Sequence, residues 1–167
     1  GAALRTVDAA IGRDPRNRLR MAVVDLNQYA GKTARTDFAL QRNFASACLV
    51  HCSLHTGRTH QIRVHMAFIG HPLVGDTVYG GSPMHGMARQ ALHATHLAFA
   101  HPVSGQALVF DAQPPPDFLG LLAALECFLQ TDGRLPLNVL VLVEGEEEIG
   151  SPHIAAFMQE RRAALRG

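Results

Sequence analysis

One stretch of this chain, residues 55–81, constrains the fold more than any other. It begins His-Thr-Gly-Arg-Thr-His-Gln-Ile-Arg-Val-His and ends His-Pro-Leu-Val-Gly-Asp-Thr-Val-Tyr-Gly-Gly. Thr56 can cap a helix that begins near Thr59 and runs to Ile69, and Gly70 can end that helix in a left-handed turn. The stretch therefore predicts a short helix between two glycine-rich turns.

The predicted helix has one apolar face and a cationic start. Ile62, Met66 and Ile69 are spaced by four and three residues, so they share a face that we expect to be buried. The first turn and a half carry Arg58, Thr59, His60 and Arg63. Unpaired backbone N–H groups and fixed cations together suit a phosphate or a carboxylate. The sequence therefore predicts an anion-binding site at this helix start.

These residues closely resemble the third conserved block of the RluA/RluD-type RNA pseudouridine synthases, written T-G-R-x-H-Q-I-R-x-H and then G-H-P-L-x-G-D-x-x-Y-G. The resemblance runs from about Thr6 to about Pro116 and includes the run Gln90-Ala91-Leu92-His93-Ala94. It implies the C-terminal half of a catalytic domain that isomerises uridine in structured rRNA or tRNA. It also implies a cytoplasmic protein that needs no metal or organic cofactor.

The resemblance assigns roles to individual side chains. Arg63 would be the catalytic cation that pairs with the family's aspartate. The RNA-binding side chains would be Arg58, His60, Gln61, Arg16, Arg18 and Arg20, and the pocket residues Ile62, Leu73 and Tyr79. Each assignment has an alternative. Arg58 and Gln61 could bond local backbone, Ile62 and Leu73 could be plain core, and Tyr79 could fill the turn.

The family's nucleophilic aspartate belongs to an H-R-L-D block, and this block does not occur in the 167 residues. We therefore expect a synthase that is incomplete and inactive alone, or an RNA-binding remnant without catalysis. The opening Gly1-Ala2-Ala3 is typical of a cut or partial product. Arg63 would then lie beside no carboxylate. If the Arg63 side chain points into solvent on the far side of the sheet, or is already paired with a local aspartate in a closed core, the isomerase interpretation loses its basis.

Charge is distributed unevenly along the chain. Residues 1–70 carry ten lysines and arginines against four aspartates, a net charge of +6, whereas residues 71–125 carry −2 and residues 126–167 carry −3. A basic N-terminal half favours a nucleic-acid partner, although a solvated basic surface is nearly as common. No apolar run is long enough to cross a membrane. The three cysteines fit buried thiols in a reducing compartment.

The remaining pattern predicts an α+β fold, with a mixed, mainly antiparallel sheet and one packed helix. Alternating apolar residues indicate a three-stranded meander over Leu19–Leu26, Thr33–Asn43 and Ala47–Leu54. Residues Leu92–Ala100 predict a further strand that a hairpin turn joins to a returning one. Half a domain would leave a sheet edge exposed, so we expect self-association.

The last part of the chain has a different character, which divides the chain into residues 1–119 and 120–167. We expect a helix capped by Asp117, a strand over Leu135–Val143 and a final helix, as in a chimera or a misjoined frame. The run E-G-E-E-E-I-G-S resembles the di-zinc metallopeptidases of carnosinase and carboxypeptidase-G type, which would make Glu147 the general base and Glu148 a metal ligand. Because that family's other ligands are missing, a solvated acidic loop is favoured. The histidine spacings also predict no metal site.

Overall fold

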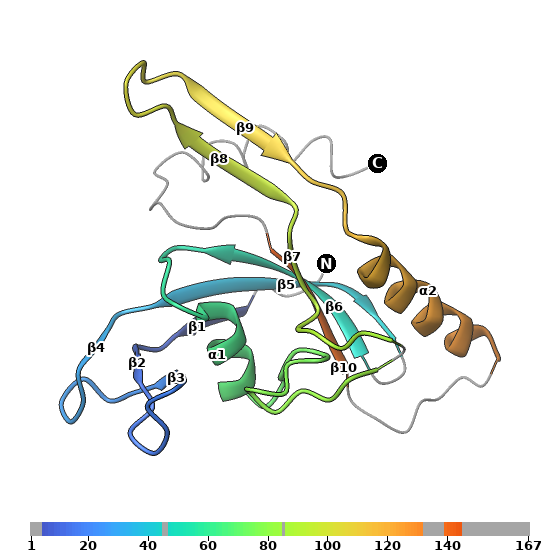
Figure 1. The fold of residues 1–167 in the computed structure, drawn as a ribbon, viewed down its shortest axis with the longest axis horizontal. Coiled ribbons are helices and arrows are strands. Elements are labelled where there is room, and N and C mark those ends of the chain that lie inside the picture. Colours follow the sequence, from blue (N-terminus) through green and yellow to red (C-terminus); the bar gives the residue numbers. More distant parts are fainter. Residues whose placement is uncertain (1–4, 45–46, 85, 132–138, 145–167) are drawn as a thin grey trace.

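The computed structural model describes residues 5–44, 47–84, 86–131 and 139–144 (Figure 1). These residues form a five-stranded sheet in the order β1-β5-β6-β10-β7, a three-stranded sheet in the order β3-β2-β4, and the β8–β9 hairpin. The elements are β1 (Arg5–Asp8), β2 (Ile11–Arg13), β3 (Met21–Val23), β4 (Gly31–Lys32), β5 (Arg35–Asn43), β6 (Ala47–Leu54), α1 (Gln61–Phe68), β7 (Leu92–Ala94), β8 (His96–Ala100), β9 (Ala107–Asp111), α2 (Pro116–Thr131) and β10 (Val139–Glu144).

The core of the five-stranded sheet is the antiparallel pair β5–β6, as predicted. Thr36 lies opposite Leu54, and the register shifts at a bulge between Leu40 and Arg42. Alternate residues of these strands face α1, because side chains on a strand point to opposite sides in turn. The resulting core contains Phe38, Cys48, Val50, Cys52 and Leu54 from the sheet and Ile62, Met66 and Ile69 at the helix. The predicted apolar face of α1 is therefore confirmed.

Two strand predictions were wrong, one in the partner of a strand and one in its continuity. The segment after Leu19 does not join the β5–β6 meander, because β3 pairs instead with β2 in the smaller sheet, and β1 pairs with β5. The strand predicted over Leu92–Ala100 is interrupted at Thr95, so β7 and β8 belong to different sheets. The predicted hairpin is present as β8–β9, which extends away from the larger sheet (Figure 1).

The N-terminal end of α1 differs from the prediction, whereas its C-terminal end agrees with it. His60 is the N-cap residue and lies in the left-handed region at φ 58°, without a side-chain cap, so the prediction of Thr56 as the cap was wrong. The Thr56 hydroxyl instead bonds Arg35 and Gln61. Gly70 ends the helix at φ 82°, and its N–H donates to Ala67 O, as predicted.

A second core forms where α2 packs beside the loops that follow α1. Phe118, Leu121 and Leu125 are fully buried there against Phe44 and Ala91. Cys127 on the same helix is exposed, contrary to the prediction of burial, whereas Cys52 is buried. Within the described ranges, no helix is both long and apolar enough to span a bilayer.

The predicted tail strand is present as β10 and runs parallel to both of its neighbours, β6 and β7. It therefore fills an interior position of the sheet, although it comes from the segment assigned to a separate unit. The acidic run after Glu144 and the predicted final helix lie outside the described residues.

Candidate functional site

A cavity of about 300 Å³ opens at the start of α1. Its wall combines the loop that leads from β6 into α1 with residues that lie at β7. The lining residues are Leu54, Gly57, Arg58, Thr59, His60, Gln61, Ile62, Arg63, Gln90 and Leu92. This volume is at the lower end of the range for small-molecule sites and suits a single planar base.

The turn after α1 supports two side chains of the cavity wall, because Asp76 bonds Arg63 and Tyr79 bonds His60. Gly75 adopts φ 72°, and a Cβ there would lie 2.0 Å from Arg89 O, so the turn requires glycine. Asp76 O then accepts hydrogen bonds from the N–H groups of Tyr79 and Gly81. The tight turn holds the Asp76 side chain, which is 1% exposed, against α1.

Arg63 makes a two-pronged ion pair with Asp76. Its Nε–H donates to Asp76 Oδ2 and its Nη2–H to Asp76 Oδ1, both at 2.8 Å, and its side chain is 11% exposed. The guanidinium carbon also lies 4.8 Å from the centre of the Tyr79 ring. The hydrogen bond to Asp76 raises the pKa of Arg63 above its ordinary value, so the guanidinium is a permanent cation.

The expectation that Arg63 lies beside no carboxylate was wrong, because the sequence does not reveal that the turn folds Asp76 back onto the helix. This pairing with a local aspartate weakens the assignment of Arg63 as the catalytic cation. It does not occupy the whole group, however. Asp76 takes two of five N–H donors, and the other three have no hydrogen-bond partner within the described residues. Arg63 can therefore bind a second anion in the cavity.

His60 lies at the cavity wall and is held by Tyr79. Its Nδ1 is 2.9 Å from the Tyr79 hydroxyl, which also accepts a hydrogen bond from Met21 N–H at 3.1 Å. Burial and the nearby Arg63 charge lower the pKa of His60 below its ordinary value. The imidazole is therefore neutral near pH 7. Its left-handed backbone is unusual for a residue other than glycine and marks a strained position.

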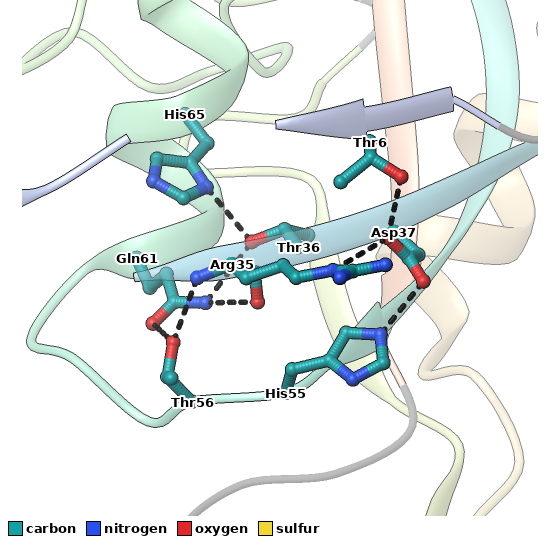
Figure 2. Close-up of polar contacts among 8 residues, drawn as sticks. All are labelled: Thr6, Arg35, Thr36, Asp37, His55, Thr56, Gln61 and His65. Atoms are coloured by element: carbon teal, nitrogen blue, oxygen red, sulfur yellow. Dashed lines mark hydrogen bonds and ion pairs between the residues drawn. The ribbon is translucent and has the colours of Figure 1, made fainter. Parts of the chain in front are cut away.

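Gln61 ties the cavity loop to β5 (Figure 2). Its Oε1 accepts hydrogen bonds from Thr56 Oγ1 at 2.8 Å and from Arg58 N–H at 3.0 Å. Its Nε2 donates to Arg35 O and to Thr36 Oγ1, both at 3.0 Å. These four bonds use both N–H donors and both acceptor sites of the Gln61 amide. The structure therefore places Gln61 in a structural role, and the RNA contact predicted for it gains no support.

The network continues to His65 inside α1 (Figure 2). His65 Nε2 is 2.9 Å from Ala9 O, and its Nδ1 is 2.9 Å from Thr36 Oγ1. A carbonyl oxygen only accepts, so Nε2 carries the proton. Burial lowers the pKa of His65, so the ring is neutral and Nδ1 accepts from the Thr36 hydroxyl. Donation therefore runs in one direction, from Gln61 through Thr36 and His65 to Ala9.

A second polar group surrounds Asp37 on β5 (Figure 2). Thr6 Oγ1 donates to Asp37 Oδ1, and His55 Nε2 bonds Oδ2, each at 2.7 Å, with Arg35 Nε at 3.5 Å. Burial alone would raise the pKa of Asp37, but the bonds from Thr6 and His55 hold it below its ordinary value. The His55 side chain is 49% exposed directly before the cavity loop. The sequence interpretation did not identify this pair.

The other predicted site residues are divided between the wall, the core and a neighbouring loop. Arg58 and Ile62 line the cavity, and Arg58 Nε also donates to Thr33 O at 3.0 Å. Leu73 is completely buried in the core and is not among the lining residues, so its assignment to the pocket is corrected. Tyr79 is not among the lining residues, but its hydroxyl holds His60, which is one of them. The arginines Arg16, Arg18 and Arg20 lie in and beside the β2–β3 connection.

The wall also contains Gln90 and Leu92, which the sequence interpretation did not select as site residues. A signal existed, since both occur in the run Gln-Ala-Leu-His-Ala that is part of the family resemblance. For metals, no three His, Cys, Asp or Glu side chains cluster within the part of the chain that the structure describes. Glu147 and Glu148 lie outside that part.

Comparisons with known proteins show what the segment around this site is similar to. Residues 6–68 match the family described as RNA pseudouridylate synthase. The matched segment contains β1 to β6 and α1, and thus most of the cavity wall and its polar network. This segment is therefore similar to the RNA pseudouridylate synthases.

The individual relatives extend the similarity. Over 139 residues the chain is 51% identical to ribosomal large subunit pseudouridine synthase D of Nitrosomonas europaea, covering 78% of this chain and 39% of that protein. Over 133 residues it is 47% identical to the protein of the same name from Xylella fastidiosa, covering 72% and 39%. The chain thus spans about two fifths of the length of these relatives. The expected likeness of residues 120–167 to metallopeptidases gains no support.

Proposed function

We propose that residues 6–116 form the substrate-binding half of an RNA pseudouridine synthase domain, which isomerises uridine to pseudouridine in large-subunit ribosomal RNA. The two relatives described above are both named as pseudouridine synthases of the ribosomal large subunit. The observation that carries the proposal is the cavity at the start of α1, where three N–H donors of Arg63 have no partner among the described residues and lie beside a neutral His60.

In this reaction the bond between C1′ and N1 of uridine breaks, a bond between C1′ and C5 forms, the C5 proton leaves, and N1 takes up a proton from solvent. A carboxylate must attack the nucleoside, and a cation must keep that carboxylate ionised. Arg63 is our choice for the cation, with Asp76 fixing its orientation. The uracil would occupy the cavity after flipping out of the RNA, against Ile62 and Leu92. By family resemblance the carboxylate belongs to an H-R-L-D block, which these 167 residues lack.

Release of tritium from RNA labelled at uridine C5 tests this proposal. We expect no release by this chain alone. We expect release when an upstream segment that carries the family's H-R-L-D block is joined to it. Turnover by the chain alone would contradict the need for that carboxylate. RNA binding without turnover by the joined protein would favour the alternative of a binding remnant.

Three further expectations belong to this proposal and remain predictions: the division of the chain near residue 119, a cytoplasmic location, and self-association. Because β10 already fills the sheet position between β6 and β7, self-association would use a different edge.

A further inference from the structure

The loop between β2 and β3, residues 14–20, presents an apolar side chain among arginines. Leu19 is 93% exposed, more than any other large hydrophobic residue in the described part of the chain. Arg16 and Arg18 beside it are also exposed. Isolated exposed leucines are common, so exposure alone does not indicate a function for Leu19. The hydrogen bonds and charges of the loop provide further evidence.

The loop is held rigidly by its own hydrogen bonds. The Asp14 carboxylate is buried and accepts from Arg16 N–H at 2.9 Å and from Arg20 Nε at 2.7 Å. Asn17 Oδ1 accepts from Leu19 N–H at 3.1 Å, and Asn17 O accepts from Arg20 N–H. The structure therefore fixes Leu19 in water, where its side chain gains nothing from burial.

The same bonds leave the loop tip cationic. Asp14 is the one acid between residues 11 and 23, and it is neutralised by Arg20. The backbone N–H of Arg16 and the Arg20 side chain hold the pKa of Asp14 below its ordinary value. Neither Arg16 nor Arg18 forms an ion pair within the described residues. The guanidinium groups of Arg16 and Arg18, which have no ion pair among the described residues, thus lie in the same loop as the exposed Leu19 side chain.

The root of the loop is attached to the cavity wall. Arg20 Nη1 donates to Val78 O at 3.4 Å, and Met21 N–H donates to the hydroxyl of Tyr79, which holds His60. The loop and the cavity therefore keep a fixed spacing, so one ligand can contact both.

We propose that this loop is an RNA wedge, in which Leu19 packs on an unstacked base near the target uridine while Arg16 and Arg18 bind the adjacent phosphates. The proposal rests on the proposed function in taking RNA as the ligand. Apolar wedges that partly unstack bases between cationic contacts are an established mode of nucleic-acid binding. An anionic membrane has similar chemistry, but a single leucine buries too little area to anchor a protein there.

The test measures fluorescence anisotropy with two labelled RNAs, a stem–loop with unpaired uridines and a fully paired duplex of the same stem. Salt is varied from about 50 to about 200 mM. Leu19→Ser should weaken binding of the stem–loop about fivefold, since the RNA would partly bury the leucine in the complex. The salt dependence of binding should not change. The substitution should not affect the duplex. Arg18→Gln should reduce the salt slope by about 0.7 to 0.9 on both RNAs.

Val103 gives the matched control, because it is 90% exposed at the β8–β9 turn without a neighbouring arginine. Val103→Ser should leave both affinities unchanged. The wedge is refuted if Leu19→Ser behaves like Val103→Ser, if it weakens the duplex equally, or if wild type binds neither RNA. Leu19-dependent binding to anionic phospholipid vesicles in place of RNA would also refute it.

The two proposals can fail separately. A stem–loop affinity that depends on Leu19 supports the wedge even if the joined protein releases no tritium. Tritium release with an unaffected Leu19→Ser variant supports the synthase and refutes the wedge.

Discussion

At the scale of single residues, Gln61 links the cavity loop to the sheet through four hydrogen bonds. Gln61→Leu keeps the volume but leaves buried polar partners unpaired. We expect it to lower the free energy of unfolding by about 2 to 4 kcal/mol, as measured in urea. Gln90→Leu is the control, because Gln90 makes no side-chain hydrogen bond in the described residues, and it should cost less than about 0.5 kcal/mol. Equal losses would contradict the structural role of Gln61.

His65 gives a pH prediction at the same scale. Its pKa in the folded chain lies below the ordinary value of about 6.5. The unfolded chain therefore binds more protons below that pH, and the stability that neutral His65 contributes, complete above about pH 6.5, is lost as the pH falls. His65→Gln should reduce the decline in unfolding free energy between about pH 7.5 and 5.5, by less than about 1.4 kcal/mol per pH unit.

His71→Gln serves as the comparison for this pH series, because His71 is exposed and forms no side-chain bond in the described part. It should keep the wild-type pH dependence. A His65→Gln variant with the same decline as wild type would show that His65 is not the titrating group.

At the scale of elements, the Arg63–Asp76 pair joins α1 to the turn after it. Asp76→Asn leaves a largely buried guanidinium without its counter-charge, so we expect a loss of about 2 to 4 kcal/mol in unfolding free energy. The pair of His96 with Asp111, whose carboxylate is 76% exposed, is the control, and Asp111→Asn should change stability by less than about 1 kcal/mol. An Asp76→Asn variant with the wild-type unfolding free energy would show that the ion pair does not stabilise the turn.

The sequence predicted those elements that local pattern determines. The apolar face of α1, its end at Gly70, and the strands β5 and β6 follow from spacing within a few residues. The pairing of β3 could not be predicted in this way, because a three-residue strand takes its partner from tertiary contacts. The same holds for the N-cap, where Thr56 was drawn into the Gln61 network instead.

At the scale of the whole molecule, distant segments complete both the sheet and the site. The strand β10 was predicted as a strand, but not its place between β6 and β7, because parallel pairing over such a separation leaves no local signal. The cavity shows the same limit. One motif gave five of the wall residues, Arg58, His60, Gln61, Ile62 and Arg63, whereas Gln90 and Leu92 reach the wall only through the fold. Asp37 and His55 also meet only across paired strands.

We propose that Arg63, oriented by Asp76, binds a catalytic carboxylate in this cavity through the N–H donors that no described residue occupies. The most direct test is single-turnover pseudouridine formation by the joined protein that carries Arg63→Gln, with RNA affinity measured in parallel. We predict a fall in rate of at least about a hundredfold, with RNA affinity changed less than about threefold. A rate near that of the unsubstituted protein, or a loss explained entirely by weaker RNA binding, would contradict the account.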